Sequence, residues 1–91
     1  MVFFTFNQKR YIGEIKYGKD DRNGNFWRGL KVLGYLELYK WQYRNVEKIF
    51  PAILMPLEDI NLTHQVIAKK LKITLFGIIE VGKKFDVKRI E

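Results

Sequence analysis

The sequence has no cysteine, a single histidine and no long apolar run among its 91 residues. Without thiols, a disulfide framework and a thiolate zinc site are excluded. The one histidine, His64, excludes a histidine-rich metal cluster and argues against a Ser-His-Asp triad. No segment reaches the roughly 20 apolar residues that span a bilayer, and the apolar start at residues 1–6 lacks the length and the basic residues of a secretory signal. We therefore expect a cytoplasmic protein without a membrane partner.

Acidic residues are scarce relative to basic ones. The chain has 17 lysines and arginines against 10 acidic residues, a net charge of +7 and an isoelectric point near 9.7. This surplus favours a polyanionic partner, with nucleic acid first and an anionic membrane surface second, although many small intracellular proteins are basic without binding one. With 47% apolar residues, residues 1–91 are expected to form a single domain.

The pattern of apolar residues predicts both strands and helices. Strands are expected at 2–6, 10–17, 47–55, 74–81 and 85–90, a long helix at 26–43 capped by Asn23 or Asn25, and a shorter helix at 61–71. This order, β-β-α-β-α-β-β, predicts the α/β class, with a mixed β-sheet flanked by helices.

The expected long helix is apolar on two sides, with Val32 and Leu36 on one stripe and Leu38 and Trp41 on the other. Such a helix is buried on both sides or forms an oligomer contact. The apolar run that follows suits a strand covered on both faces. Pro51 within that run favours an edge or a bulge, because proline cannot donate a hydrogen bond to the ladder.

Glu14 and Lys16 are two residues apart in the second expected strand, so their side chains point to the same face. A carboxylate there can hold a hard divalent cation, and a lysine can orient a water or stabilise phosphate charge. The alternative is an ordinary ion pair on a surface strand, because Glu-x-Lys is a common sequence.

Four segments, in their order along the chain, carry a resemblance to a known family: residues 12–18 around Glu14 and Lys16, 28–36, 52–56 and 67–81. The chain resembles the core of the PD-(D/E)XK nucleases, a superfamily that includes restriction-enzyme-like nucleases and archaeal Holliday-junction resolvases. The resemblance implies a restriction-endonuclease-like core and phosphodiester hydrolysis with Mg²⁺ or Mn²⁺. It also implies that Glu14 is the metal-binding carboxylate, Lys16 the catalytic lysine and the Ile15 carbonyl a further metal ligand.

The chain departs from this family at its start. The family's second carboxylate, an aspartate, belongs on the strand before Glu14, yet no acidic residue precedes Glu14 here. The family's N-terminal helix also has no counterpart, which suggests a truncated form. Asp20 and Asp21 could reach the site but follow Lys16, and Lys31 stands where many members carry a polar residue, often glutamine. We therefore expect weak Mg²⁺ binding and a weak or inactive enzyme.

Basic residues near the Glu14–Lys16 strand are the expected phosphate contacts: Lys9, Arg10, Lys19, Arg22, Arg28 and Lys31. A homodimer is expected because a missing first helix would leave one sheet face partly uncovered. Packing in the core or in the dimer is the favoured role of Trp27 and Trp41, over stacking on bases. His64 is expected at the surface, and Lys69, Lys70 and Lys72 on a solvated helix face.

Two other functions fit the same sequence. The first is a non-enzymatic, basic nucleic-acid-binding module of unrelated α+β topology. The second is a dimeric protein-interaction domain whose exposed helix pairs with another chain.

Overall fold

The computed structural model describes residues 1–17, 22–43 and 48–90. Its elements, in chain order, are β1 (Val2–Phe6), β2 (Lys9–Ile15), α1 (Arg22–Gly29), α2 (Val32–Gln42), β3 (Ile49–Pro56), a 3₁₀ turn η1 (Leu57–Asp59), α3 (Leu62–Leu71), β4 (Thr74–Val81) and β5 (Lys84–Ile90).

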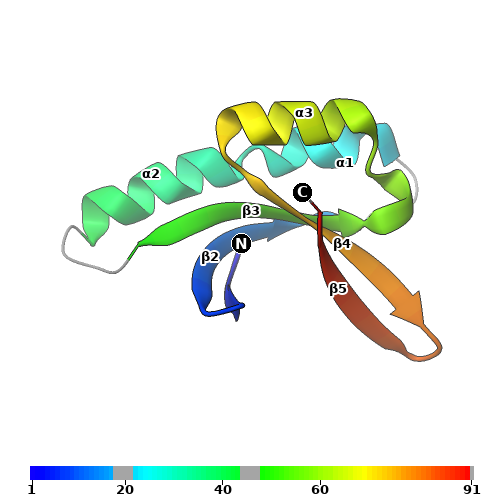
Figure 1. Cartoon of the computed structure of the whole chain (residues 1–91). Coiled ribbons are helices and arrows are strands. Elements are labelled where there is room, and N and C mark those ends of the chain that lie inside the picture. The colour runs from blue at the N-terminus through cyan, green and yellow to red at the C-terminus, as the bar shows by residue number, and fades with distance from the viewer. Residues whose placement is uncertain (18–21, 44–47, 91) are drawn as a thin grey trace.

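The strands form one sheet in the order β1-β2-β3-β4-β5. β2, β3 and β4 are parallel, and β1 and β5 pair antiparallel at the two edges. A mixed sheet with helices confirms the expected class. All three α-helices lie on the same face of the sheet (Figure 1). This follows from the strand order, because two crossovers of the same hand that step in the same direction place their helices on one face.

The helices bury one apolar layer against the sheet. Ile12, Ile53 and Leu75 come from three neighbouring strands, and Phe26 and Val32 meet them from α1 and α2. β3 supplies much of this layer because it is the middle strand, and seven of its eight residues are buried. The prediction that the apolar run is a strand covered on both faces is confirmed.

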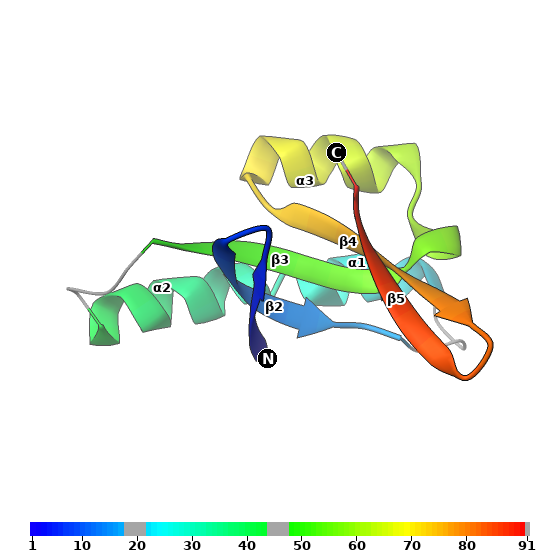
Figure 2. The same cartoon turned by 60° about the horizontal axis from the view of Figure 1, so that its bottom comes forward.

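The other sheet face carries no helix among the described residues, yet its centre is buried. Both hairpins bend away from the helices, and Figure 2 shows β1 and β5 in front of β3 when this face comes forward. Phe76 at the centre of this face lies 5.3 Å from the ring of Phe4, 5.0 Å from Phe6 and 5.2 Å from Tyr11. The curled sheet therefore covers its own concave face, and the uncovered face that motivated a dimer is largely absent.

The prediction of one long helix over 26–43 is wrong. The helical region begins at Arg22 and is divided, because Leu30 and Lys31 separate α1 from α2. The hydrogen bonds through this junction run from residue i to i−3, as in a 3₁₀ turn, and keep the two helices nearly continuous. Asn23 and Asn25 therefore lie within α1 and not before its first residue.

Two further expectations are corrected by burial and pairing. Pro51 lies in the central strand, but β4 begins to pair only at the next residue, so Pro51 has a strand partner on one side alone. His64 is buried and stacks on Phe26 at 4.5 Å. It completes a capping box with Asn61 at the start of α3, whose expected beginning is confirmed.

Candidate functional site

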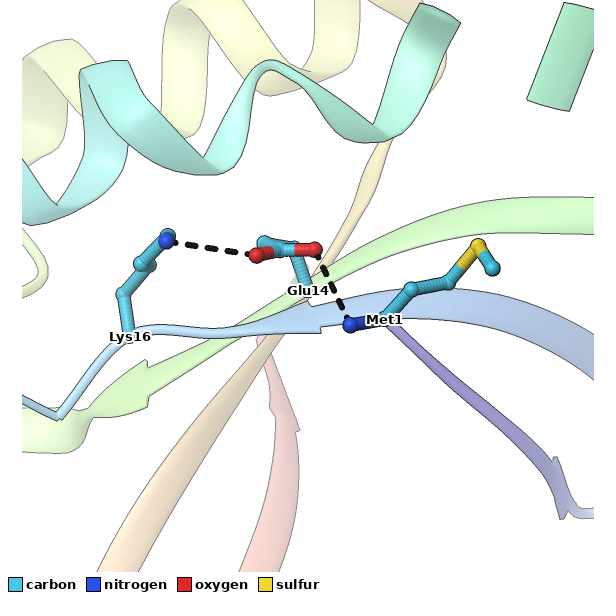
Figure 3. A network of polar contacts seen from close by, with 3 residues as sticks. All are labelled: Met1, Glu14 and Lys16. Carbon is cyan, nitrogen blue, oxygen red and sulfur yellow. Dashed lines mark ion pairs between the residues drawn. The ribbon is translucent and has the colours of Figure 1, made fainter. Parts of the chain in front are cut away.

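Glu14 and Lys16 meet at the carboxyl end of β2, as the strand alternation predicts. The ammonium nitrogen of Lys16 lies 3.2 Å from Glu14 Oε1. The N–H of Lys16 donates to the Leu54 carbonyl at 2.9 Å, which continues the ladder with β3 beyond the end of β2. Both side chains rise toward the face that carries the helices (Figure 3). The site is therefore set by backbone pairing in the middle of the sheet.

The carboxylate of Glu14 is mostly buried, and its two oxygens differ in their partners. Only 8% of Glu14 is exposed, while the Lys16 side chain is 24% exposed. The α-amino nitrogen of Met1 lies 3.4 Å from Oε2. At that distance the two groups form an ion pair but not a hydrogen bond. Within the described residues Oε2 has no hydrogen-bond partner. One carboxylate thus faces two ammonium groups and is left with an unsatisfied oxygen.

This arrangement is a poor fit for the divalent metal that the family resemblance implies. Among residues 1–17, 22–43 and 48–90 no group of three His, Cys, Asp or Glu side chains could hold a metal ion. Mg²⁺ dehydrates reluctantly and requires well-placed oxygen ligands. The ammonium groups of Lys16 and Met1 occupy the space beside the carboxylate that a cation would need. Asp20 and Asp21 lie outside the described residues.

The other residues expected at the site are divided between the two faces of the sheet. The ammonium of Lys9 lies 5.6 Å from the Phe50 ring, on the side away from the helices. Arg10 lines a cavity with Tyr35 and Tyr39 of α2, on the helix side. Ile15 alternates away from Glu14, and its side chain is half exposed. Along β2, Arg10 and Glu14 are about 13 Å apart.

The other basic candidates in the described part of the chain lie on the helices. Arg28 in the last turn of α1 and Lys31 at the start of α2 are both exposed. Lys19 and the side chain of Arg22 lie outside the described part of the structure. Among the described residues, the structure thus brings Glu14 and Lys16 together and places Lys9 on the other face of the sheet.

The contact between Met1 and Glu14 was missed by sequence reasoning about function. The signal was available in the hairpin, because pairing Val2 with Gly13 brings the preceding residue beside Glu14. Neither tryptophan packs in the core of this chain, because Trp27 is 50% exposed and Trp41 69%. The other half of that prediction, packing in a dimer, stays a prediction.

No protein-family model, curated protein or solved structure matches this chain. In the part of the chain that the structure describes, no helix is long and apolar enough to cross a membrane.

Proposed function

We propose that this chain is a nucleic-acid-binding protein, with DNA as its first expected partner, derived from a metal-dependent endonuclease and weak or inactive in cleavage. The net charge of +7 supports a polyanionic partner. The mixed sheet with Glu14 and Lys16 side by side agrees with a nuclease-like core.

One observation carries the choice of binding over cleavage: the Glu14 carboxylate is paired with ammonium groups, and among the described residues it belongs to no group of three side chains that could hold a metal ion. A hard cation is held next to a phosphate by sites that contain two or more carboxylate ligands. In this chain Glu14 serves to position Lys16, whose partly exposed ammonium can contact a phosphate oxygen. Mg²⁺ or Mn²⁺ would find at most Glu14 and the Ile15 carbonyl, and we expect weak occupancy.

The test combines a binding and a cleavage assay on the purified chain. Binding to a DNA duplex should be independent of sequence and should weaken with salt, with a slope of log affinity against log salt of roughly −4 to −5 if about five phosphates are contacted. Cleavage in Mg²⁺ or Mn²⁺ should be absent or very slow. Affinity that does not change with salt, or fast cleavage abolished by Glu14→Gln, would contradict the proposal.

The strongest competing function is a dimeric protein-interaction domain. One observation favours it: large apolar side chains are exposed on α2 and at the β1 edge, namely Met1, Phe3, Leu38, Trp41 and Tyr43. We call this group the α2–β1 patch. Exposed apolar groups of this kind often mark a contact with another chain. A homodimer through this patch is compatible with nucleic-acid binding elsewhere on the molecule.

A further inference from the structure

We infer that single-stranded nucleic acid binds in a groove at the amino ends of the parallel strands. The inference rests on the proposed nucleic-acid-binding function and specifies its surface and its ligand. This groove, called the basic groove below, has a volume of about 530 Å³ and is lined by Tyr39, Lys40, Tyr43, Lys48, Phe50 and Lys72, with apolar residues at its floor.

The topology explains why these lysines meet. β2, β3 and β4 are parallel, so their amino ends lie side by side at one end of the sheet. α2 and α3 run in the opposite direction to these strands, so their carboxyl ends lie at the same end of the sheet (Figure 1). Lys40 lies in the last turn of α2, Lys48 precedes β3, and Lys72 caps α3 just before β4. Three lysines far apart in sequence therefore line one groove.

In the described part of the chain, few acidic groups neutralise the charge of the basic groove. Among the described residues neither Lys48 nor Lys72 has an ion-pair partner, and Glu37 is the one acidic residue that lines the groove. Glu37 pairs with Lys40 at 4.0 Å between two exposed side chains, a contact that neutralises little. Lysines in the last turn of a helix are also favoured by the helix dipole, but Lys48 lies in no helix. The groove therefore suits a polyanion.

Aromatic rings on one wall of the groove favour single-stranded over double-stranded nucleic acid. The rings of Tyr39 and Tyr43 lie 4.9 Å apart and tilted by 37°, and Tyr43 is half exposed. The Phe50 ring, by contrast, packs on the sheet face away from the helices and is not part of this wall. Aromatic side chains among cations bind single strands by stacking on bases. Bases in a duplex are already stacked and paired, so a groove of this kind reaches unpaired bases.

The test measures binding of a fluorescein-labelled single strand of about 20 nucleotides, longer than a typical single-module site, by anisotropy. The groove variant carries Lys40→Gln, Lys48→Gln and Lys72→Gln. The control variant carries Lys83→Gln, Lys84→Gln and Lys88→Gln, which removes the same charge from the β4–β5 hairpin. If all three groove lysines contact phosphates, the salt slope should become shallower by about two in the groove variant alone, and affinity at low salt should fall at least tenfold more than in the control.

A second pair of variants tests the aromatic wall. Tyr43→Ala should weaken single-strand binding about tenfold or more and leave duplex binding less affected. Phe85→Ala removes an exposed ring from the control hairpin and should leave affinity unchanged. Circular dichroism of each variant checks the fold.

The outcomes separate this inference from the proposed function. If the unmodified chain binds neither a single strand nor a duplex at low salt, the proposed function fails. If it binds but the two lysine triples weaken binding equally, or if it prefers the duplex and Tyr43→Ala has no effect, the basic groove is not the site while nucleic-acid binding stands.

Discussion

At the scale of single residues, the Glu14–Lys16 pair combines a buried charge with a half-satisfied carboxylate. Burying Glu14 carries a desolvation cost that the ion pairs with Lys16 and Met1 offset. The two partners differ in what they can do when the pair is broken. The Lys16 side chain is 24% exposed to water, whereas that of Glu14 is only 11% exposed. Because of this difference, removing Glu14 and removing Lys16 should change the free energy of unfolding by different amounts.

We expect Glu14→Gln to change the free energy of unfolding by less than about 1 kcal/mol, because it removes a buried charge and leaves an ammonium that can be solvated. Lys16→Met should cost more, about 1–3 kcal/mol, because it leaves the buried carboxylate with fewer partners. Urea unfolding of both variants measures the difference. A larger cost for Glu14→Gln than for Lys16→Met would show that the carboxylate is held by contacts other than this pair.

His64 is the second residue with a measurable consequence. Burial lowers the pKa of His64 below its ordinary value of 6.5, although a backbone hydrogen bond and the charge of Asp59 act in the opposite direction. The folded chain therefore binds a proton at this site less readily than the unfolded chain does. Its contribution to stability is complete above about pH 6.5 and is lost as pH falls from there toward the lowered pKa.

His64→Gln should reduce this acid sensitivity, because glutamine also suits the third position of a capping box and stays neutral. Urea midpoints measured at about pH 7.5 and about pH 5.5 should differ less in the variant than in the unmodified chain, by up to about 1.4 kcal/mol per pH unit for one proton. Asn61→Ala is the control. It removes the cap itself and should cost about 1 kcal/mol at both pH values. An unchanged pH dependence in His64→Gln would place the titrating group elsewhere.

At the scale of elements, the strands were predictable and the helical junction was not. β1 and β4 have the predicted bounds because alternating or continuous apolar residues between turn residues are a local signal. The division between α1 and α2 depends on a tertiary contact. A Cβ atom at Gly29 would lie 2.9 Å from Ile53 Cγ2, so α1 can pack this closely only with glycine there. No local pattern reveals which of two helical glycines has that task.

The two glycines give a matched prediction. Gly29→Ala should destabilise the chain by about 1–2 kcal/mol, because the clash with the fully buried Ile53 outweighs the gain in helix propensity. Gly34→Ala should stabilise it by about 0.5–1 kcal/mol, since nothing lies within 4 Å of the added Cβ. Thermal unfolding of both variants measures the contrast. Equal effects would mean that α1 can move away from β3 at little cost.

The two sites also differ in whether the local sequence predicts them. Glu14 and Lys16 could be placed together from strand alternation alone. The basic groove could not, because Lys40, Lys48 and Lys72 meet only through two crossovers of the sheet. Lys72 is exposed, as predicted for a solvated helix face, but the sequence does not reveal its neighbours across the groove. His64 seemed exposed because a polar residue early in a helix does not reveal what packs over it.

At the scale of the whole molecule, charge and apolar surface are distributed unevenly. The amino ends of the parallel strands carry the basic groove, while Glu58, Asp59 and Glu80 follow or end strands at the opposite edge. The α2–β1 patch lies beside the basic groove and shares Tyr43 with it. The concave face is filled by the chain itself. If a second copy binds, the α2–β1 patch is therefore the surface we expect it to use.

We expect sedimentation at micromolar concentration to show a dimer that depends on the α2–β1 patch. Leu38 and Trp41 are 62% and 69% exposed on the outer side of α2, and neither lines the basic groove. Leu38→Glu with Trp41→Glu should give a monomer, because two like charges would meet their copies across a symmetric contact. The unmodified chain should also unfold at a temperature that rises with protein concentration, and the double variant should not. Val81→Glu with Phe85→Glu, which charges an equally exposed apolar pair on the β4–β5 hairpin, is the control and should stay dimeric. A monomeric unmodified chain would reject the dimer and leave this patch to another partner.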